Sequence, residues 1–158
     1  MRTKRTQHYK EYASDAFRLL GKYGSSAEYK RRVLEAVERR REELGTRIDA
    51  PIGSPTEAQI IKAEEAIEDA QAVLQDLEAA ERAIMICKQR DAKNASMIVK
   101  AVKAVYMLDP HRLLKHKEIM NTVIAFSILA PCDKSTVYRW LSIARTLFAR
   151  ERGLRIKD

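Results

Sequence analysis

The sequence predicts an all-α fold: an N-terminal helical hairpin or coiled coil, followed by a C-terminal helix-turn-helix domain. The 158 residues include only 5 Gly and 4 Pro, too few for the many turns of a β-sandwich or barrel. Apolar side chains recur at spacings of three and four over most of the chain. Near the C-terminus, two such helical patterns are separated by a very short break, which is the layout of a helix-turn-helix.

Residues 1–48 form a basic N-terminal part with two helices. The first helix ends near the turn-forming residues 24–26, and Gly45 ends the second, which covers about 27–44. Apolar residues lie at helical spacing in both. In the first helix they are Tyr12, Ala16, Leu19, Leu20 and Tyr23, and in the second they are Tyr29, Val33, Leu34, Val37 and Leu44.

Residues 49–93 consist of a linker and a long acidic helix. The stretch DAPIGSPTEA breaks the chain, and the helix is expected over about 57–88. It carries a heptad seam with one polar interruption, formed by Ile60, Ala63, Ile67, Ala70, Leu74, Leu77, Glu81 and Ile84. Two arrangements remain open. The seam packs within the chain against Val33 and Val37, or it pairs with another chain, giving a homodimer through the helix 57–88.

Residues 94–158 form the predicted helix-turn-helix domain, with a first helix over about 94–108. A second helix is stopped by Pro131, and small Ser127 within it fits a close helix crossing. Asp133 is expected to cap the third helix with its carboxylate, so that this helix begins at Lys134. Its apolar stripe should hold it against the domain, and the stripe consists of Val137, Trp140, Leu141, Ala144, Leu147 and Phe148. The second helix should bury Ile119, Met120, Val123, Ile124 and Phe126.

Charge points to a polyanionic partner. The net charge is +8 with a pI near 9.6, and it divides into about +6 over 1–48, −5 over 49–93 and +7 over 94–158. The helix from Lys134 should expose cations, hydroxyls and one aromatic ring, which is the chemistry that recognises duplex DNA in the major groove. The candidate DNA-binding residues are Lys134, Ser135, Thr136, Tyr138, Arg139, Ser142, Arg145 and Arg150, with Arg152 as a further phosphate contact.

The string Lys-Ser-Thr-Val-Tyr-Arg-Trp at 134–140, after an apolar helix, resembles the recognition helix of phage late-gene transcription regulators related to RinA and ArpU. The C-terminal part of those regulators is similar to region 4 of sigma factors. The leading helices, with Leu20, Tyr23 and Tyr29, are also similar to that group. The resemblance implies a phage- or prophage-derived regulator that binds near a promoter and contacts RNA polymerase. It assigns DNA recognition to Ser135, Thr136, Tyr138 and Arg139.

Other classes are less well supported by the sequence. No phosphate loop, GxSxG or HExxH motif occurs, so we expect neither catalysis nor a cofactor. His111, His116 and Cys132 lack the spacing of a metal site, and Cys87 fits a small buried hydrophobe. No apolar run is long enough for a membrane span, which predicts a cytoplasmic protein. Two alternatives remain: a viral DNA packaging protein resembling a small terminase subunit, and a helical interaction module that binds no DNA.

Overall fold

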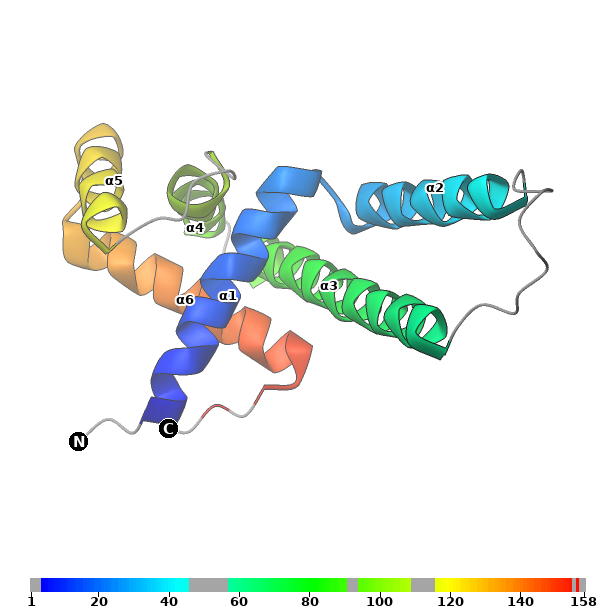
Figure 1. Ribbon diagram of the computed structural model, residues 1–158. Helices are drawn as coiled ribbons and strands as arrows, with labels where there is room; N and C mark the ends of the chain where they lie inside the picture. The colour runs from blue at the N-terminus through cyan, green and yellow to red at the C-terminus, as the bar shows by residue number, and fades with distance from the viewer. Residues whose placement is uncertain (1–3, 46–56, 91–93, 109–115, 155, 157–158) are drawn as a thin grey trace.

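A computed structural model of the chain describes residues 4–45, 57–90, 94–108, 116–154 and 156, which are all-α (Figure 1). No strand occurs within these residues. In chain order the helices are α1 (Lys4–Tyr23), α2 (Ser26–Gly45), α3 (Glu57–Arg90), α4 (Ala95–Val102), the π-helix η1 (Lys103–Met107), α5 (His116–Leu129) and α6 (Lys134–Arg152). The predicted all-α class is therefore confirmed.

Most of the expected helix limits agree with the structure to within one or two residues. The long helix ends at Arg90, where 88 was expected, and α6 begins at Lys134 as predicted. The exception is the helix expected over 94–108, which changes at Lys103 from α- to π-geometry. The residues that directly follow Leu108 and the linker before α3 lie outside the described residues.

The core forms where α1 crosses α3 and α6 (Figure 1). Phe17 of α1 and Phe148 of α6 are both fully buried, with ring centroids 5.9 Å apart. Tyr106 of η1 stacks on the other side of Phe17 at 6.1 Å. Five elements contribute the largest fully buried side chains, which are Phe17, Leu77, Val102, Val123, Val137, Leu141 and Phe148. None of the described side chains of α2 is buried, so α2 lies outside this core.

The buried face of α3 differs from the predicted seam. Of the seam residues whose side chains are described, only Leu77 is fully buried, and Ile67 is 54% exposed. The side chains buried on the C-terminal half of α3 are mainly alanines, namely Ala79, Ala80 and Ala83, together with Leu77 and Cys87. Alanine allows the backbones of neighbouring helices to approach closely, so α1, α4 and α6 all contact this face. The heptad pattern identified the helix but not the side that is buried.

The start of α2 is fixed by polar contacts. The Ser25 hydroxyl accepts a hydrogen bond from the Glu28 N–H at 3.1 Å, and the Glu81 carboxylate accepts one from the Ser26 N–H. Both acceptors satisfy amide groups that a helix leaves unpaired at its N-terminus. The polar interruption of the seam, Glu81, therefore caps another helix. Tyr29 also packs on Tyr23 of α1, with ring centroids 4.7 Å apart, which positions α2 beside the core.

A second polar cluster fastens the C-terminal end of α6. Arg152 donates a hydrogen bond to the Asp76 carboxylate at 2.7 Å, and the Tyr12 hydroxyl donates to the same oxygen. Burial and the nearby carboxylate raise the pKa of Tyr12 above its ordinary value. Six residues further along α3, Arg82 pairs with Glu151 at 2.9 Å. The expectation that Arg152 faces a DNA phosphate is therefore not supported, because Asp76 already occupies its guanidinium.

Candidate nucleic-acid interface

The break between α5 and α6 is short. The helix α5 ends at Leu129, and the amide of Ala130 still donates to the Phe126 carbonyl at 2.9 Å. The amide of Cys132 donates to the Ser127 carbonyl at 3.1 Å, which turns the chain back over the end of α5. The next helix starts two residues later. Residues 116–152 are therefore two helices that meet at Pro131 and not one continuous rod.

Asp133 occupies the N-cap position of α6, but not in the expected way. Its backbone is extended, with φ −73° and ψ 146°, as an N-cap requires. Its carboxylate makes no capping hydrogen bond; instead its carbonyl accepts from the amides of Thr136 at 3.0 Å and Val137 at 3.3 Å. The predicted side-chain cap is thus wrong, whereas the predicted helix start is right.

One side of α6 is held firmly in the core. All six residues of the predicted apolar stripe are buried, from Val137 to Phe148, and Ala149 is buried as well. The left-handed Gly153, with φ 78°, ends the helix, and its amide donates to the Arg150 carbonyl at 3.1 Å. The opposite side of α6 consequently has a fixed orientation toward solvent.

The eight candidate DNA-binding residues divide into two sets. Lys134, Ser135, Arg139 and Arg150 are exposed, and Thr136, Tyr138, Ser142 and Arg145 are partly buried. Spacing by three and four places Ser135, Arg139, Ser142, Thr146 and Arg150 on one face of α6. This face is called the polar stripe below. Thr146 belongs to it and was not among the predicted residues, although its i+4 spacing from Ser142 could have found it.

Tyr138 and Arg145 lie at the flank of the polar stripe. Tyr138 packs against the hydrophobic core, so part of its ring is unavailable for a ligand. The Arg145 Nε is buried, and within the described part of the chain it has no hydrogen-bond partner. These two residues are less accessible than the sequence predicted, because the flank of α6 is covered by neighbouring helices.

Arg90, a residue of α3, lies beside the polar stripe of α6. It is the last residue of α3. Together with six residues of α6 it lines a shallow trough. Two apolar side chains, three guanidinium groups and two hydroxyls line this trough. Its lining residues are Arg90, Arg139, Ser142, Ile143, Thr146, Leu147 and Arg150. Sequence analysis missed Arg90, since no local pattern relates the end of α3 to α6.

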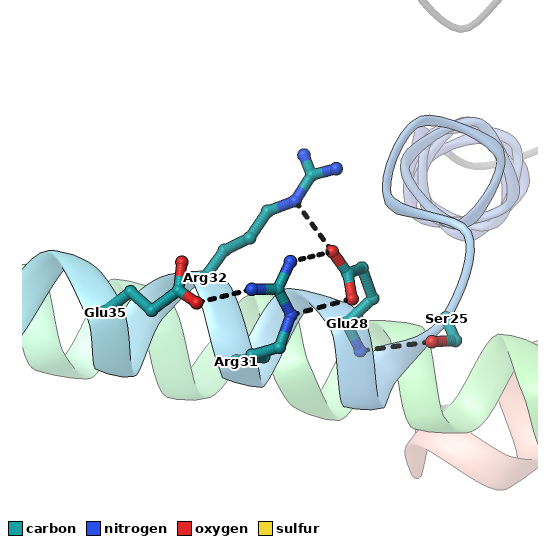
Figure 2. Close-up of polar contacts among 5 residues, drawn as sticks. All are labelled: Ser25, Glu28, Arg31, Arg32 and Glu35. Carbon is teal, nitrogen blue, oxygen red and sulfur yellow. Dashed lines mark hydrogen bonds and ion pairs between the residues drawn. The ribbon is translucent and has the colours of Figure 1, made fainter.

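Not all of the basic side chains are free to bind a ligand. On α2, Arg31 and Arg32 both contact the Glu28 carboxylate, and Arg31 also contacts Glu35 (Figure 2). These hydrogen bonds, the one from Arg31 above all, lower the pKa of Glu28 to about 2. By contrast, Arg90, Arg139 and Arg150 make no ion pair within the residues that the structure describes. The trough is therefore one place where three guanidinium groups without an ion-pair partner in the described part of the chain lie together.

The structure also bears on the other candidate sites. No group of three potential metal ligands occurs among the described residues, and the side chains of His111 and His116 lie outside them. Cys87 is buried, as predicted, and burial raises the pKa of its thiol. Cys132 is a free cysteine as well. None of the described helices has an apolar segment long enough to cross a membrane.

Comparison of the chain with protein-family models, with curated proteins and with solved structures gave no match.

Proposed function

We propose that the protein is a sequence-specific DNA-binding transcription regulator in which α5, the break at Pro131 and α6 act as a helix-turn-helix. The observation that carries this proposal is the polar stripe. It carries cations that make no ion pair with the described residues, together with hydroxyls, on the side of α6 opposite the face that is buried in the core. The major groove is about 12 Å wide and admits one α-helix, whose donors can then contact base edges and phosphates.

The side chains of α6 have different expected roles in DNA binding, according to their chemistry. Arg139 is exposed and can donate two parallel hydrogen bonds to guanine, which is the commonest specific contact to a base. Ser135 and Ser142 lie on either side of it along the stripe and can contact bases or sugars. Lys134 and Arg150, at the two ends of the helix, are placed to neutralise phosphates.

We also propose a phage origin and a role in transcription for this protein. The resemblance of residues 134–140 to phage late-gene regulators supports a phage-derived regulator that works beside RNA polymerase in the cytoplasm. Such a protein changes transcription by binding and not by catalysis. A viral packaging protein would also bind DNA, but as a closed ring of many subunits, which native mass spectrometry distinguishes from a dimer.

Replacing Arg139 with alanine should remove base recognition. After selection of bound sequences from a random pool, Arg139→Ala is expected to weaken binding to the selected duplex by about 1–3 kcal/mol and to random duplex much less. Arg150→Ala is the matched control, because it removes the same side chain from the same face of α6 and should weaken both duplexes about equally. Fluorescence anisotropy titrations measure both affinities. Equal losses from both duplexes in the Arg139→Ala protein would contradict base recognition.

We also propose that the regulator is a homodimer, formed through a groove between α2 and α3. The two helices lie side by side and extend away from the rest of the protein (Figure 1). Tyr29, Lys30, Val33, Leu34 and Val37 of α2 face four residues of α3 across the groove, namely Ile67, Ala70, Gln71 and Leu74. Leu34 is 55% exposed and Ile67 54% exposed, which leaves a continuous apolar surface uncovered.

The charges beside this groove are complementary to those of a second copy of the chain. Lys30 lines the groove on α2 and makes no ion pair with the described residues, whereas Glu65, Glu68 and Asp69 lie near the groove on α3. A two-fold axis places α2 of one protomer beside α3 of its partner, so the basic and acidic flanks meet and both apolar surfaces are covered. This arrangement gives an interface of four helices. It involves α3, which the sequence predicted to form a dimer, and it also requires α2.

A charge in the groove should separate the protomers. Leu34→Glu is expected to weaken dimerisation at least about tenfold, roughly 1.4 kcal/mol, because the carboxylate would be buried without a partner. Analytical ultracentrifugation over a range of concentrations measures the change. Ile128→Glu is the control, since it makes the same kind of substitution at an exposed residue of α5. A wild-type chain that stays monomeric at high micromolar concentration would rule out the dimer and leave the DNA-binding proposal standing.

A further inference from the structure

The trough between the end of α3 and the polar stripe has features that DNA recognition by α6 alone does not require. It encloses about 200 Å³, which is larger than a single anion needs. Arg90 closes it from α3, outside the pair of helices that forms the proposed helix-turn-helix. Its three arginines come from positions far apart along the helices, and all three are exposed.

The chemistry of the trough is specific for anions. Arginine and hydroxyl side chains supply only donors to a bound phosphate, and none of the described residues that line the trough is acidic. The apolar side chains of Ile143 and Leu147 offer nothing to compete for the guanidinium groups. Since Arg90, Arg139 and Arg150 have no ion-pair partners in the described part of the chain, a bound phosphate breaks no ion pair among those residues.

The length of the trough identifies the kind of anion. With a rise of about 1.5 Å per residue, the Cα atoms of Arg139 and Arg150 lie about 16 Å apart along α6. Several phosphates in a row fill such a length, whereas one free phosphate does not. We propose that the trough binds consecutive phosphates of one DNA strand, and that Arg90 is a phosphate-binding residue supplied by α3. This inference rests on the proposed DNA-binding function.

Arg90 and Arg150 are the guanidinium groups assigned to phosphates, whereas the base contact is left to Arg139. It belongs to the exposed polar stripe and also forms the end of the trough nearest the N-terminal half of α6. Arg150 lies at the other end and Arg90 lines the trough from α3, so the backbone of a bound strand would run along the C-terminal half of α6. The N-terminal half is then left to enter the groove. Phosphate contacts of this kind fix the orientation of a recognition helix and carry no sequence information.

Arg90→Ala tests the inference. The variant should fold normally, because the Arg90 side chain is exposed and makes no ion pair with the described residues. At about 0.1 M salt we expect roughly fivefold to tenfold weaker binding, equal for selected and random duplex, and a salt slope reduced by about 1. Lys88→Ala is the matched control: it removes one exposed positive charge from the same last turn of α3, but Lys88 does not line the trough. It should leave the slope unchanged.

The salt dependence of affinity, measured by anisotropy for wild type, Arg90→Ala, Arg90→Lys and Lys88→Ala, decides the matter. Recovery of most of the slope in Arg90→Lys would support a phosphate contact, because lysine retains the charge. An unchanged slope in Arg90→Ala, or an equal loss in Lys88→Ala, would overturn the inference while leaving DNA binding intact. Absence of duplex binding by the wild type would instead refute the proposed function itself.

Discussion

Replacing Phe148 with alanine is expected to lower the free energy of unfolding by about 3–5 kcal/mol, the range found for buried aromatic residues. Phe148 is fully buried and contacts two rings of α1, Phe17 and Tyr12, each at a centroid distance of 5.9 Å. The substitution would leave a cavity at the crossing of α1 and α6, where the neighbouring side chains can collapse only partly. Urea unfolding monitored by circular dichroism measures the loss.

The control for this prediction is Leu129→Ala. It also removes a large apolar side chain, but Leu129 is 83% exposed, so the stability should change by less than about 0.5 kcal/mol. A loss below about 1 kcal/mol in Phe148→Ala would show that this crossing does not hold α6. The buried side of α6 also fixes the orientation of the polar stripe on the opposite side. That orientation would then have no structural basis.

Replacing Gly21 with valine is expected to destabilise the fold by about 3 kcal/mol, the upper part of the range for overpacking. A Cβ at Gly21 would lie 2.8 Å from both the Cα and the carbonyl oxygen of Met107. These are backbone atoms, so relief requires α1 to move away from η1. In an open helix position, replacing glycine with alanine is favourable by about 0.5–1 kcal/mol; the β-branched valine gains less, and the clash outweighs this gain.

Lys22→Val provides the matched comparison, because it introduces the same side chain one residue later at an exposed position of α1. Its effect should stay within about 0.5 kcal/mol. The difference between the two midpoints of thermal unfolding then isolates the contact with Met107. If both variants were equally stable, the close approach of α1 and η1 would not contribute to the fold.

The long helix α3 links the two proposed interfaces. The N-terminal half of α3 forms one wall of the groove proposed for the second protomer, and its last residue closes the trough proposed for DNA phosphates. Between them its alanine-rich face lies in the core. A rigid helix that is fixed in this way would set the distance between the dimer axis and each α6. In a dimer this distance determines the spacing of the two DNA half-sites.

The helices themselves were predictable from the sequence, because local patterns determine them. The apolar stripe of α6 is buried as predicted, and its start at Lys134 follows from the short break and the polar residues around Asp133. Exposure of Ser135 and Arg139 then follows from the same periodicity, since residues opposite an apolar stripe face solvent. These features depend on residues fewer than twenty positions apart.

The sequence could not indicate which face of α3 is buried. Its large apolar residues mark a seam that includes exposed Ile67, whereas the core uses Ala79, Ala80 and Ala83. An apolar pattern is recognised mainly by its large side chains, whereas two helices that cross closely require small side chains between them. The same limit applies to Gly21, whose requirement for glycine comes from Met107, a residue of a distant element.

The sequence by itself therefore determined an all-α protein with basic ends and a C-terminal helix whose outward face carries cations and hydroxyls. Only the tertiary structure decided which cations act together. It paired Arg152 with Asp76 and Arg82 with Glu151, and it brought Arg90 to Arg139 and Arg150. Helical periodicity reports one helix at a time, whereas the partner of a charged side chain is set by how helices cross, and that depends on packing between distant parts of the chain.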